Sequence, residues 1–165
     1  MPSPTVAEQL VAGGRDLIAS EGTGDLSVRR LTEASGRSTM CVYSHFGNRK
    51  RLLAEVYRSC AADLTGALAA AGPGFARAYA AYAETASRHF LFLFAADLDG
   101  LGVDPGLRLD LADAVTDLAA ASLEGAARDA ALAFWLPLHA AVWLDTVQRL
   151  AGEPGRFPTA ALIAP

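Results

Sequence analysis

Apolar residues recur at helical spacing along most of the chain, and glycine or proline interrupts this pattern at intervals. Between positions 49 and 71, Leu52, Leu53, Val56 and Tyr57 begin such a pattern, which is typical of one buried face of an α-helix. The chain is 52% apolar, and Ala and Leu supply much of that share with few β-branched runs, which favours helices over sheets. The sequence therefore predicts an all-α fold.

The interruptions divide the chain into predicted helices. Thr5 and Glu8 form a capping-box pair before the first, and Gly22 and Gly24 follow its end. The others are expected over 28–35, 38–44, 49–71, 75–94, 107–122 and 123–150, with a loop over 97–106 and a proline-broken tail over 152–165. Residues 72–74, Gly-Pro-Gly, mark the main boundary. We predict an N-terminal domain over 1–47, a connecting helix over 48–72 and a C-terminal domain over 73–165.

Length and composition limit the classes of protein to consider. With 165 residues, the chain has room for one domain or two small ones that share a core. Its most apolar run, Ala130 to Leu144, is shorter than the ~20 residues of a membrane span and contains Pro137 and His139. No signal-peptide pattern opens the chain, and two cysteines, Cys41 and Cys60, suit a reducing cytoplasm. We expect a cytoplasmic protein.

Charge is distributed unevenly along the chain. The net charge is −4, yet residues 1–60 carry eight Arg/Lys against six Asp/Glu, and residues 61–165 carry six against twelve. Only the N-terminal part is therefore suited to a polyanion.

Two short predicted helices within this basic part are joined by a tight turn at Ser35-Gly36, a pattern typical of a helix-turn-helix. The second helix, "STMCVYSHF", would lie in the major groove of DNA. Val42 and Phe46 are four residues apart and are expected to point inward. Thr39, Met40, Tyr43 and Ser44 would then face outward.

The cations Arg49, Lys50 and Arg51 open the next helix, although a helix N-terminus favours negative charge. A bound phosphate would explain this arrangement, since free N–H groups there also bind anions. The alternative is a solvated basic patch.

The stretch "LIASEGTGDLSVRRLTEASGRSTMCVYSHFGNRKRLLAEVY" resembles the DNA-binding domain of the TetR family of bacterial repressors. The resemblance rests on the small-Gly turn, the Tyr-x-His-Phe run and the position of Lys50, which matches a lysine that contacts the DNA backbone. It implies a homodimer that binds a palindromic operator in double-stranded DNA and releases it when a small molecule enters the C-terminal domain. Arg51 stands where the family commonly has an acidic residue, Met40 where it has a small residue or Pro, and Arg37 where it has a hydrophobic one.

From the pattern and the resemblance together we predict DNA contacts by Arg29, Ser38, Thr39, Met40, Tyr43, Ser44, His45, Arg49 and Lys50. Tyr43 alternatively belongs to the core or its rim, and His45 alternatively caps or stacks. Cys41 is either a small apolar residue or, with Arg37 nearby, a redox-sensitive thiol.

The C-terminal part suggests a sensor. Trp135, His139 and Trp143 recur every four residues and are expected to line an apolar pocket with a polar handle. The pattern "W-x-x-x-H" with "RHFLFLF" upstream resembles a TetR subgroup named for a Trp-His-Gly motif, with Ala140 in place of the glycine. The predicted ligand-binding residues are Tyr82, His89, Phe90, Phe94, Trp135, His139 and Trp143. Alternatively, these rings are ordinary core.

The helices between Leu107 and Leu150 are more apolar than a monomer surface, which predicts a dimer interface. We therefore expect a homodimeric repressor released by an apolar or aromatic ligand, with no cofactor. The first alternative is a small-molecule-binding protein of the same fold that has lost specific DNA binding. The second is a helical enzyme or metal protein. No catalytic constellation supports it, and His89 and His139 alone make a weak metal site.

Overall fold

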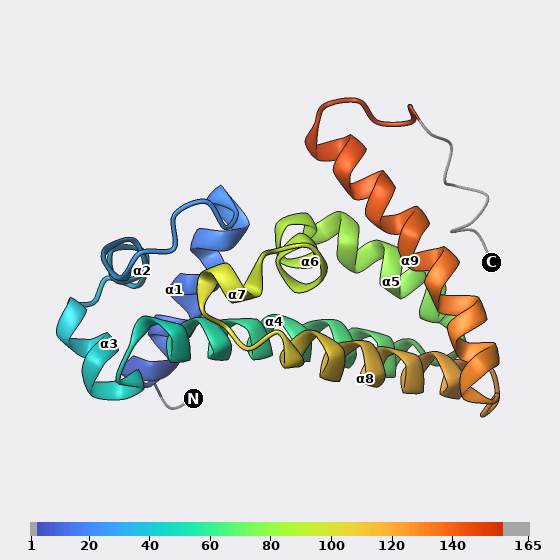
Figure 1. Cartoon of the computed structure of the whole chain (residues 1–165), viewed down its shortest axis with the longest axis horizontal. Coiled ribbons are helices and arrows are strands. Elements are labelled where there is room, and N and C mark those ends of the chain that lie inside the picture. The colour runs from blue at the N-terminus through green and yellow to red at the C-terminus, as the bar shows by residue number, and fades with distance from the viewer. Residues whose placement is uncertain (1–2, 157–165) are drawn as a thin grey trace. The chain divides into compact units, whose positions relative to one another are not determined.

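The computed structural model of the chain describes residues 3–156, which contain helices and no strand, so the predicted all-α fold is confirmed (Figure 1). Packing divides the chain into two compact units. Of the described residues, the first unit comprises 3–61 together with 88–107, and the second comprises 62–87 together with 108–156. This division concerns packing, and whether 1–47, 48–72 and 73–165 act as separate domains stays a prediction.

The first unit begins with α1 (Val6–Glu21) and α2 (Val28–Ser35). The predicted capping box is confirmed, because the Thr5 side chain accepts a hydrogen bond from the Glu8 N–H and the Glu8 carboxylate accepts one from the Thr5 N–H at 2.7 Å. The two helices pack closely at Gly13, where an added Cβ would lie only 2.7 Å from the backbone of Ser35. Glycine is therefore required at this crossing.

The next two helices are α3 (Thr39–Phe46) and α4 (Arg49–Ala71). Gly36 ends α2 in the left-handed conformation at φ 64°, which turns the chain sharply into α3. Buried Leu31, Val42 and Leu52 come from three of these helices and form part of one core. In Figure 1, α1, α2 and α3 gather about the first turns of α4.

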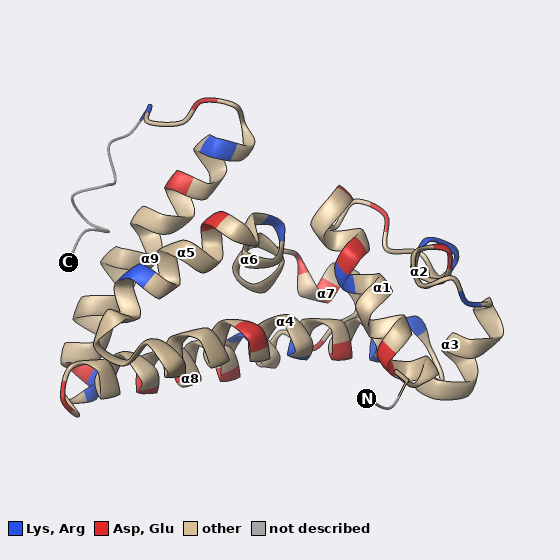
Figure 2. Cartoon of the chain, turned by 180° about the vertical axis from the view of Figure 1, so that it is seen from behind, with Lys and Arg blue, Asp and Glu red and all other residues tan. Residues whose placement is uncertain are grey.

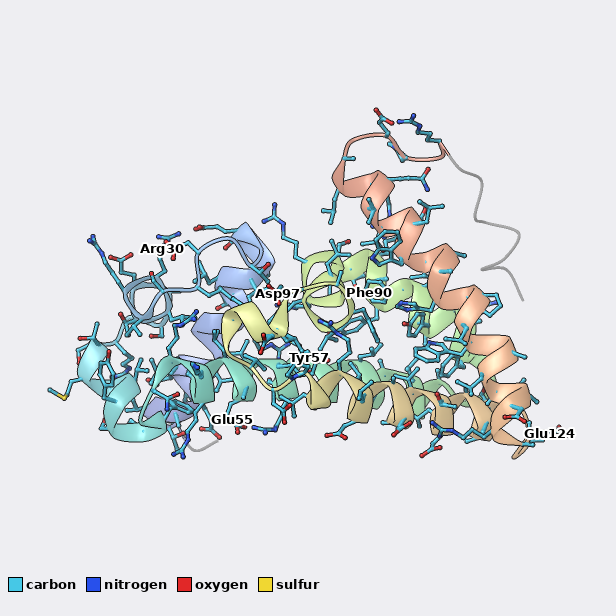
Figure 3. All side chains as sticks on the ribbon, in the orientation of Figure 1. Arg30, Glu55, Tyr57, Phe90, Asp97 and Glu124 are labelled. Atoms are coloured by element: carbon cyan, nitrogen blue, oxygen red, sulfur yellow. The ribbon has the colours of Figure 1, made fainter. Side chains whose placement is uncertain are left out.

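Two further elements complete the first unit, α6 (Ser87–Phe94) and α7 (Leu98–Leu101). Tyr57 of α4 is buried, and its hydroxyl donates to the carbonyl of Leu93 at 3.0 Å (Figure 3). The ring of Tyr57 also meets that of Phe92 edge to face, with centroids 5.5 Å apart. These contacts anchor α6 to α4.

Two predictions for this region were wrong. Residues 75–94 do not form one helix, because Ala86 leaves the helical conformation at φ −126° and ψ 44°. The predicted loop over 97–106 contains the short helix α7, which the Asp97 carboxylate caps by accepting from the N–H of Gly100.

The second unit contains the later part of α4, η1 (Gly72–Gly74), α5 (Phe75–Thr85), α8 (Gly106–Ser122) and α9 (Arg128–Leu150). Helix α9 begins five residues later than predicted, because Glu124 and Gly125 adopt positive φ values of 58° and 79°. Acidic residues recur along the exposed side of α8, as Figure 2 shows. The predicted tail lies partly outside the described residues, and positions 151–156 form turns.

Helix α9 is long and apolar enough to cross a membrane by length and composition, with a mean hydropathy of 1.4 over its most apolar window. It nevertheless packs against α5 and carries an ion pair between Asp145 and Arg149 at 2.9 Å. Arg149 also donates to the Ala83 carbonyl and the Ser87 hydroxyl, each at 3.3 Å. These contacts fix α9 to the end of α5, as expected for a helix of a folded core.

Candidate functional site

Helix α3 presents two large side chains to solvent. Met40 is 71% exposed and Tyr43 is 54% exposed, whereas Val42 between them is fully buried. Ser38, Thr39, Ser44 and His45 are exposed as well. All six of these exposed residues were predicted DNA contacts, and Val42 is buried as predicted. One face of α3 therefore packs against the rest of the first unit, and the opposite face is exposed to solvent.

The three cations at the start of α4 have different surroundings. Arg49 is half-buried, and its guanidinium donates to the carbonyls of Leu26 at 3.2 Å and Leu101 at 3.1 Å. It ties α4 to the segment before α2 and to α7. Lys50 is exposed, and its aliphatic stem lies against Gly102, where an added Cβ would be 2.6 Å from the lysine Cε. Its ammonium group is at the surface.

Arg51 is also exposed. Its backbone N–H donates to the side chain of Asn48 at 3.0 Å, so Asn48 caps the N-terminus of α4. Among residues 3–156, no carboxylate forms an ion pair with Arg51 or Lys50.

Helix α2 carries two paired arginines. Arg29, a predicted DNA contact, has a side chain that is 84% exposed and forms an ion pair with Glu33 at 2.8 Å. A hydrogen bond from Arg29 lowers the pKa of Glu33. Arg30 pairs with Glu21 and more distantly with Glu33. Surface ion pairs of this kind contribute little to stability, and whether Arg29 contacts DNA stays a prediction.

In the second unit, two of the predicted ligand-binding residues meet around a tyrosine that the sequence did not single out. The Tyr79 hydroxyl lies 2.7 Å from Nδ1 of His139, and the Tyr79 ring meets that of Trp135 edge to face at 6.5 Å. Trp135 and Tyr79 are buried, and His139 is half-buried. Tyr79 follows Phe75 by four residues on the buried face of α5. This helical spacing is the feature of the sequence that could have predicted its inward position.

Burial controls the ionisation of this cluster. Burial raises the pKa of the Tyr79 hydroxyl. Burial also lowers the pKa of His139 below 6.5. The indole N–H of Trp135 is buried and makes no hydrogen bond within the described part of the chain. The three side chains thus form a neutral cluster at neutral pH.

The other predicted ligand-binding residues lie elsewhere. His89, Phe90 and Phe94 belong to the first unit, where Nε2 of His89 lies 2.8 Å from the Arg15 carbonyl and the two phenylalanine rings are 5.1 Å apart. Phe90, which Figure 3 labels on α6, is fully buried. Tyr82 is half-buried in the second unit. Whether these residues bind a ligand stays a prediction.

Trp143 does not share the surroundings of Trp135. Eight helical residues correspond to a difference of about 80° around the axis, whereas seven correspond to about 20°. Trp143 accordingly lies in line with Leu136 and Leu150, and these three side chains are 39%, 51% and 46% exposed. Together they form the exposed apolar stripe of α9.

The described residues contain no group of three or more His, Cys, Asp or Glu side chains arranged to hold a metal ion. Cys60 is buried and Cys41 half-buried, and neither forms a disulfide within the described residues.

The structure is similar to the crystal structure of a TetR-family transcriptional regulator from Streptomyces coelicolor, with a TM-score of 0.73 and 18% sequence identity over 99% of this chain and 77% of that one. The chain has the TetR fold. No protein-family model and no curated protein matches the sequence. At this identity the TetR fold is shared, while membership of the Trp-His-Gly subgroup stays a prediction.

Proposed function

We propose that this protein is a TetR-like transcriptional regulator that acts in the cytoplasm as a homodimer and binds a palindromic operator in double-stranded DNA. The observation that carries this proposal is the exposed face of α3, with Met40 71% and Tyr43 54% exposed on a helix that Val42 anchors within a TetR fold. A helix of a DNA-binding fold that presents such side chains to solvent is suited to the major groove.

Within this proposal the residues divide by role. Thr39 and Met40 lie at the start of α3 and contact base edges, with the Met40 side chain suited to a thymine methyl group. Tyr43, Ser44, His45 and Lys50 lie at the end of α3 and the start of α4 and contact the DNA backbone. Ser38, in the turn before α3, and Arg29, on α2, make further contacts with the DNA.

The exposed apolar stripe of α9 supports the homodimer. Leu136, Trp143 and Leu150 recur every seven residues and remain between 39% and 51% exposed within one chain. Exposed apolar residues in line on a helix are typical of helix–helix association. Two copies related by a two-fold axis would cover the stripe and present two α3 helices to a palindromic site.

We further propose that the regulator is a repressor released by an apolar or aromatic small molecule in the second unit. The cluster of Tyr79, Trp135 and His139 supports this idea, since it combines ring surfaces with polar atoms that are neutral at neutral pH. Release requires that the ligand bind more tightly to the conformation unsuited to the operator.

The experiment that tests DNA binding is selection from a random pool of duplexes by the purified protein, followed by gel shifts with the enriched sequence and with the promoter flanking its own gene. A regulator enriches an inverted repeat, whereas enrichment of no sequence contradicts the proposal. Compounds are then screened for release of the bound DNA, with Trp135→Ala as the variant expected to retain DNA binding and lose release.

A second candidate function is a small-molecule-binding protein with this fold that no longer recognises a specific sequence. The bulky, exposed Met40 at the first turn of α3 favours it, because a long side chain there can prevent close approach to the groove. Ligand binding without any enriched duplex would support this alternative.

A further inference from the structure

A polar hollow lies beside the end of α3. It has a volume of about 700 Å³ and is lined by residues from the last turn of α3, the following turn and the first turns of α4. Its polar side chains are Tyr43, Ser44, His45, Arg51, Glu55 and Arg58. The hollow is open to solvent and lies entirely within the first unit.

Ion pairing distinguishes the charged residues of the hollow. Arg58 pairs with Glu55 at 2.6 Å, and Glu55 is an exposed residue of α4 that Figure 3 labels. Arg51 faces the same hollow from one turn earlier, and no carboxylate in residues 3–156 pairs with it. The charges of Arg58 and Glu55 cancel each other, so the hollow keeps the single positive charge of Arg51.

The surroundings of Arg51 leave its guanidinium open to a ligand. Gly47, at φ 75°, has no side chain on the side that Arg51 faces, and a Cβ added there would be 3.8 Å from Nη1 of Arg51. Asn48 fixes the backbone of Arg51 through the 3.0 Å hydrogen bond to its N–H. The exposed Tyr43 supplies a hydroxyl to the same hollow. These features describe a site for an anion with several oxygen atoms.

We propose that Arg51 binds a phosphodiester group of the DNA backbone in this hollow, in addition to the phosphate at Lys50. The guanidinium matches a phosphate in a two-pronged arrangement, which an ammonium group cannot reproduce. Arg49, although adjacent in sequence, is committed to the carbonyls of Leu26 and Leu101. This inference rests on the proposed function, because its ligand is the DNA that α3 is proposed to bind.

The test uses the full-length protein and the duplex enriched by selection. Arg51→Gln is compared with Arg77→Gln, which removes an equal charge from an exposed position on α5. Affinity is measured over a range of salt concentrations. Each phosphate contact contributes about one to the slope of log K against log salt, so loss of one contact per subunit should reduce the slope by about 2 in a dimer. Arg77→Gln should retain the wild-type slope.

Ethylation interference locates the phosphate itself. With wild-type protein, ethylation of the phosphate at the hollow should block binding, and with Arg51→Gln that position should cease to interfere in each half-site. Arg51→Lys keeps the positive charge at this position and should therefore keep most of the salt slope. A reduced slope in Arg51→Gln alone then indicates a lost phosphate contact and not a misfolded protein.

The two proposals fail differently. If wild-type protein enriches no duplex, the regulator proposal fails and this one fails with it. If wild-type protein binds its duplex and Arg51→Gln has the same slope and the same interference pattern, only the assignment of Arg51 is overturned.

Discussion

The hydroxyl of Tyr79 on α5 lies 2.7 Å from Nδ1 of His139 on α9. Both rings also contact Trp135, with centroids 6.5 Å and 5.6 Å away. Polar atoms buried among aromatic rings are stabilising only while their hydrogen bonds are satisfied. Protonation of His139 would disturb this arrangement, because the imidazolium would donate from both nitrogens and carry a charge out of water.

The first prediction follows from that pair. Burial lowers the pKa of folded His139 below 6.5, so the unfolded chain binds a proton at higher pH than the folded chain. The free energy of unfolding should therefore fall as pH decreases from about 6.5 toward the lowered pKa. Urea unfolding at pH 7.5 and pH 5.0 measures the change. His139→Asn should lose less stability than wild type over this interval, whereas His45→Gln, at an exposed position of α3, should behave as wild type. Equal losses in all three proteins would contradict this.

The second prediction concerns Arg49. Its guanidinium joins α4 to the carbonyls of Leu26 and Leu101, and removing it leaves both acceptors without this donor. Arg49→Gln should lower the free energy of unfolding by about 1–3 kcal/mol, as expected for hydrogen bonds to a charged group. Chemical denaturation measures this, with Arg77→Gln as the exposed control. A loss no greater than that of the control would show that the two hydrogen bonds contribute little.

The third prediction assigns Lys50 to a phosphate. Its ammonium group is exposed and free of carboxylates within the described residues, while Gly102 supports its stem. Lys50→Ala should weaken binding to every duplex and reduce the salt slope by about 2 per dimer. Gel shifts at several salt concentrations measure both effects. A changed sequence preference with an unchanged slope would instead assign Lys50 to a base.

The fourth prediction concerns recognition by α3. Thr39 and Met40 are exposed on its first turn, and Val42 holds the opposite face in the core. Thr39→Ala and Met40→Ala should each change the preferred operator more than the non-specific affinity, with a shift in discrimination of roughly 1–3 kcal/mol. Selection from a random pool with each variant is the measurement, and recovery of the wild-type sequence by both would argue against base contacts.

Local patterns predicted most of the helices. The capping box at Thr5, the glycine at 36 and the asparagine at 48 act on the residues beside them, so their effect is readable from the sequence. The break at Ala86 and the helix α7 were missed. Ala86 is a good helix former, and its conformation is not evident from neighbouring residues.

The site residues show the same difference between local effects, which the sequence reveals, and long-range contacts, which it does not. Exposure of Met40 and Tyr43 was predicted, because helical spacing fixes which residues of α3 oppose Val42. The commitment of Arg49 to Leu26 and Leu101 was not, since those carbonyls lie 23 and 52 residues away in sequence. Spacing alone likewise placed Trp143 with Trp135, although the helix turns about 80° between them.

The last prediction concerns the dimer. Leu136, Trp143 and Leu150 lie in one line along α9 and remain substantially exposed in a single chain, so their burial requires another surface. A second copy supplies that surface by symmetry, because the stripe on one chain meets the stripe on the other across a two-fold axis. Trp143→Arg places two like charges near that axis and should convert the dimer to a monomer, whereas Trp143→Phe keeps an apolar ring and should not. Light scattering at micromolar concentration measures the mass, and circular dichroism checks that each variant is folded. A wild-type protein that is monomeric and folded under these conditions would refute the dimer, and with it the reading of a palindromic operator by two α3 helices.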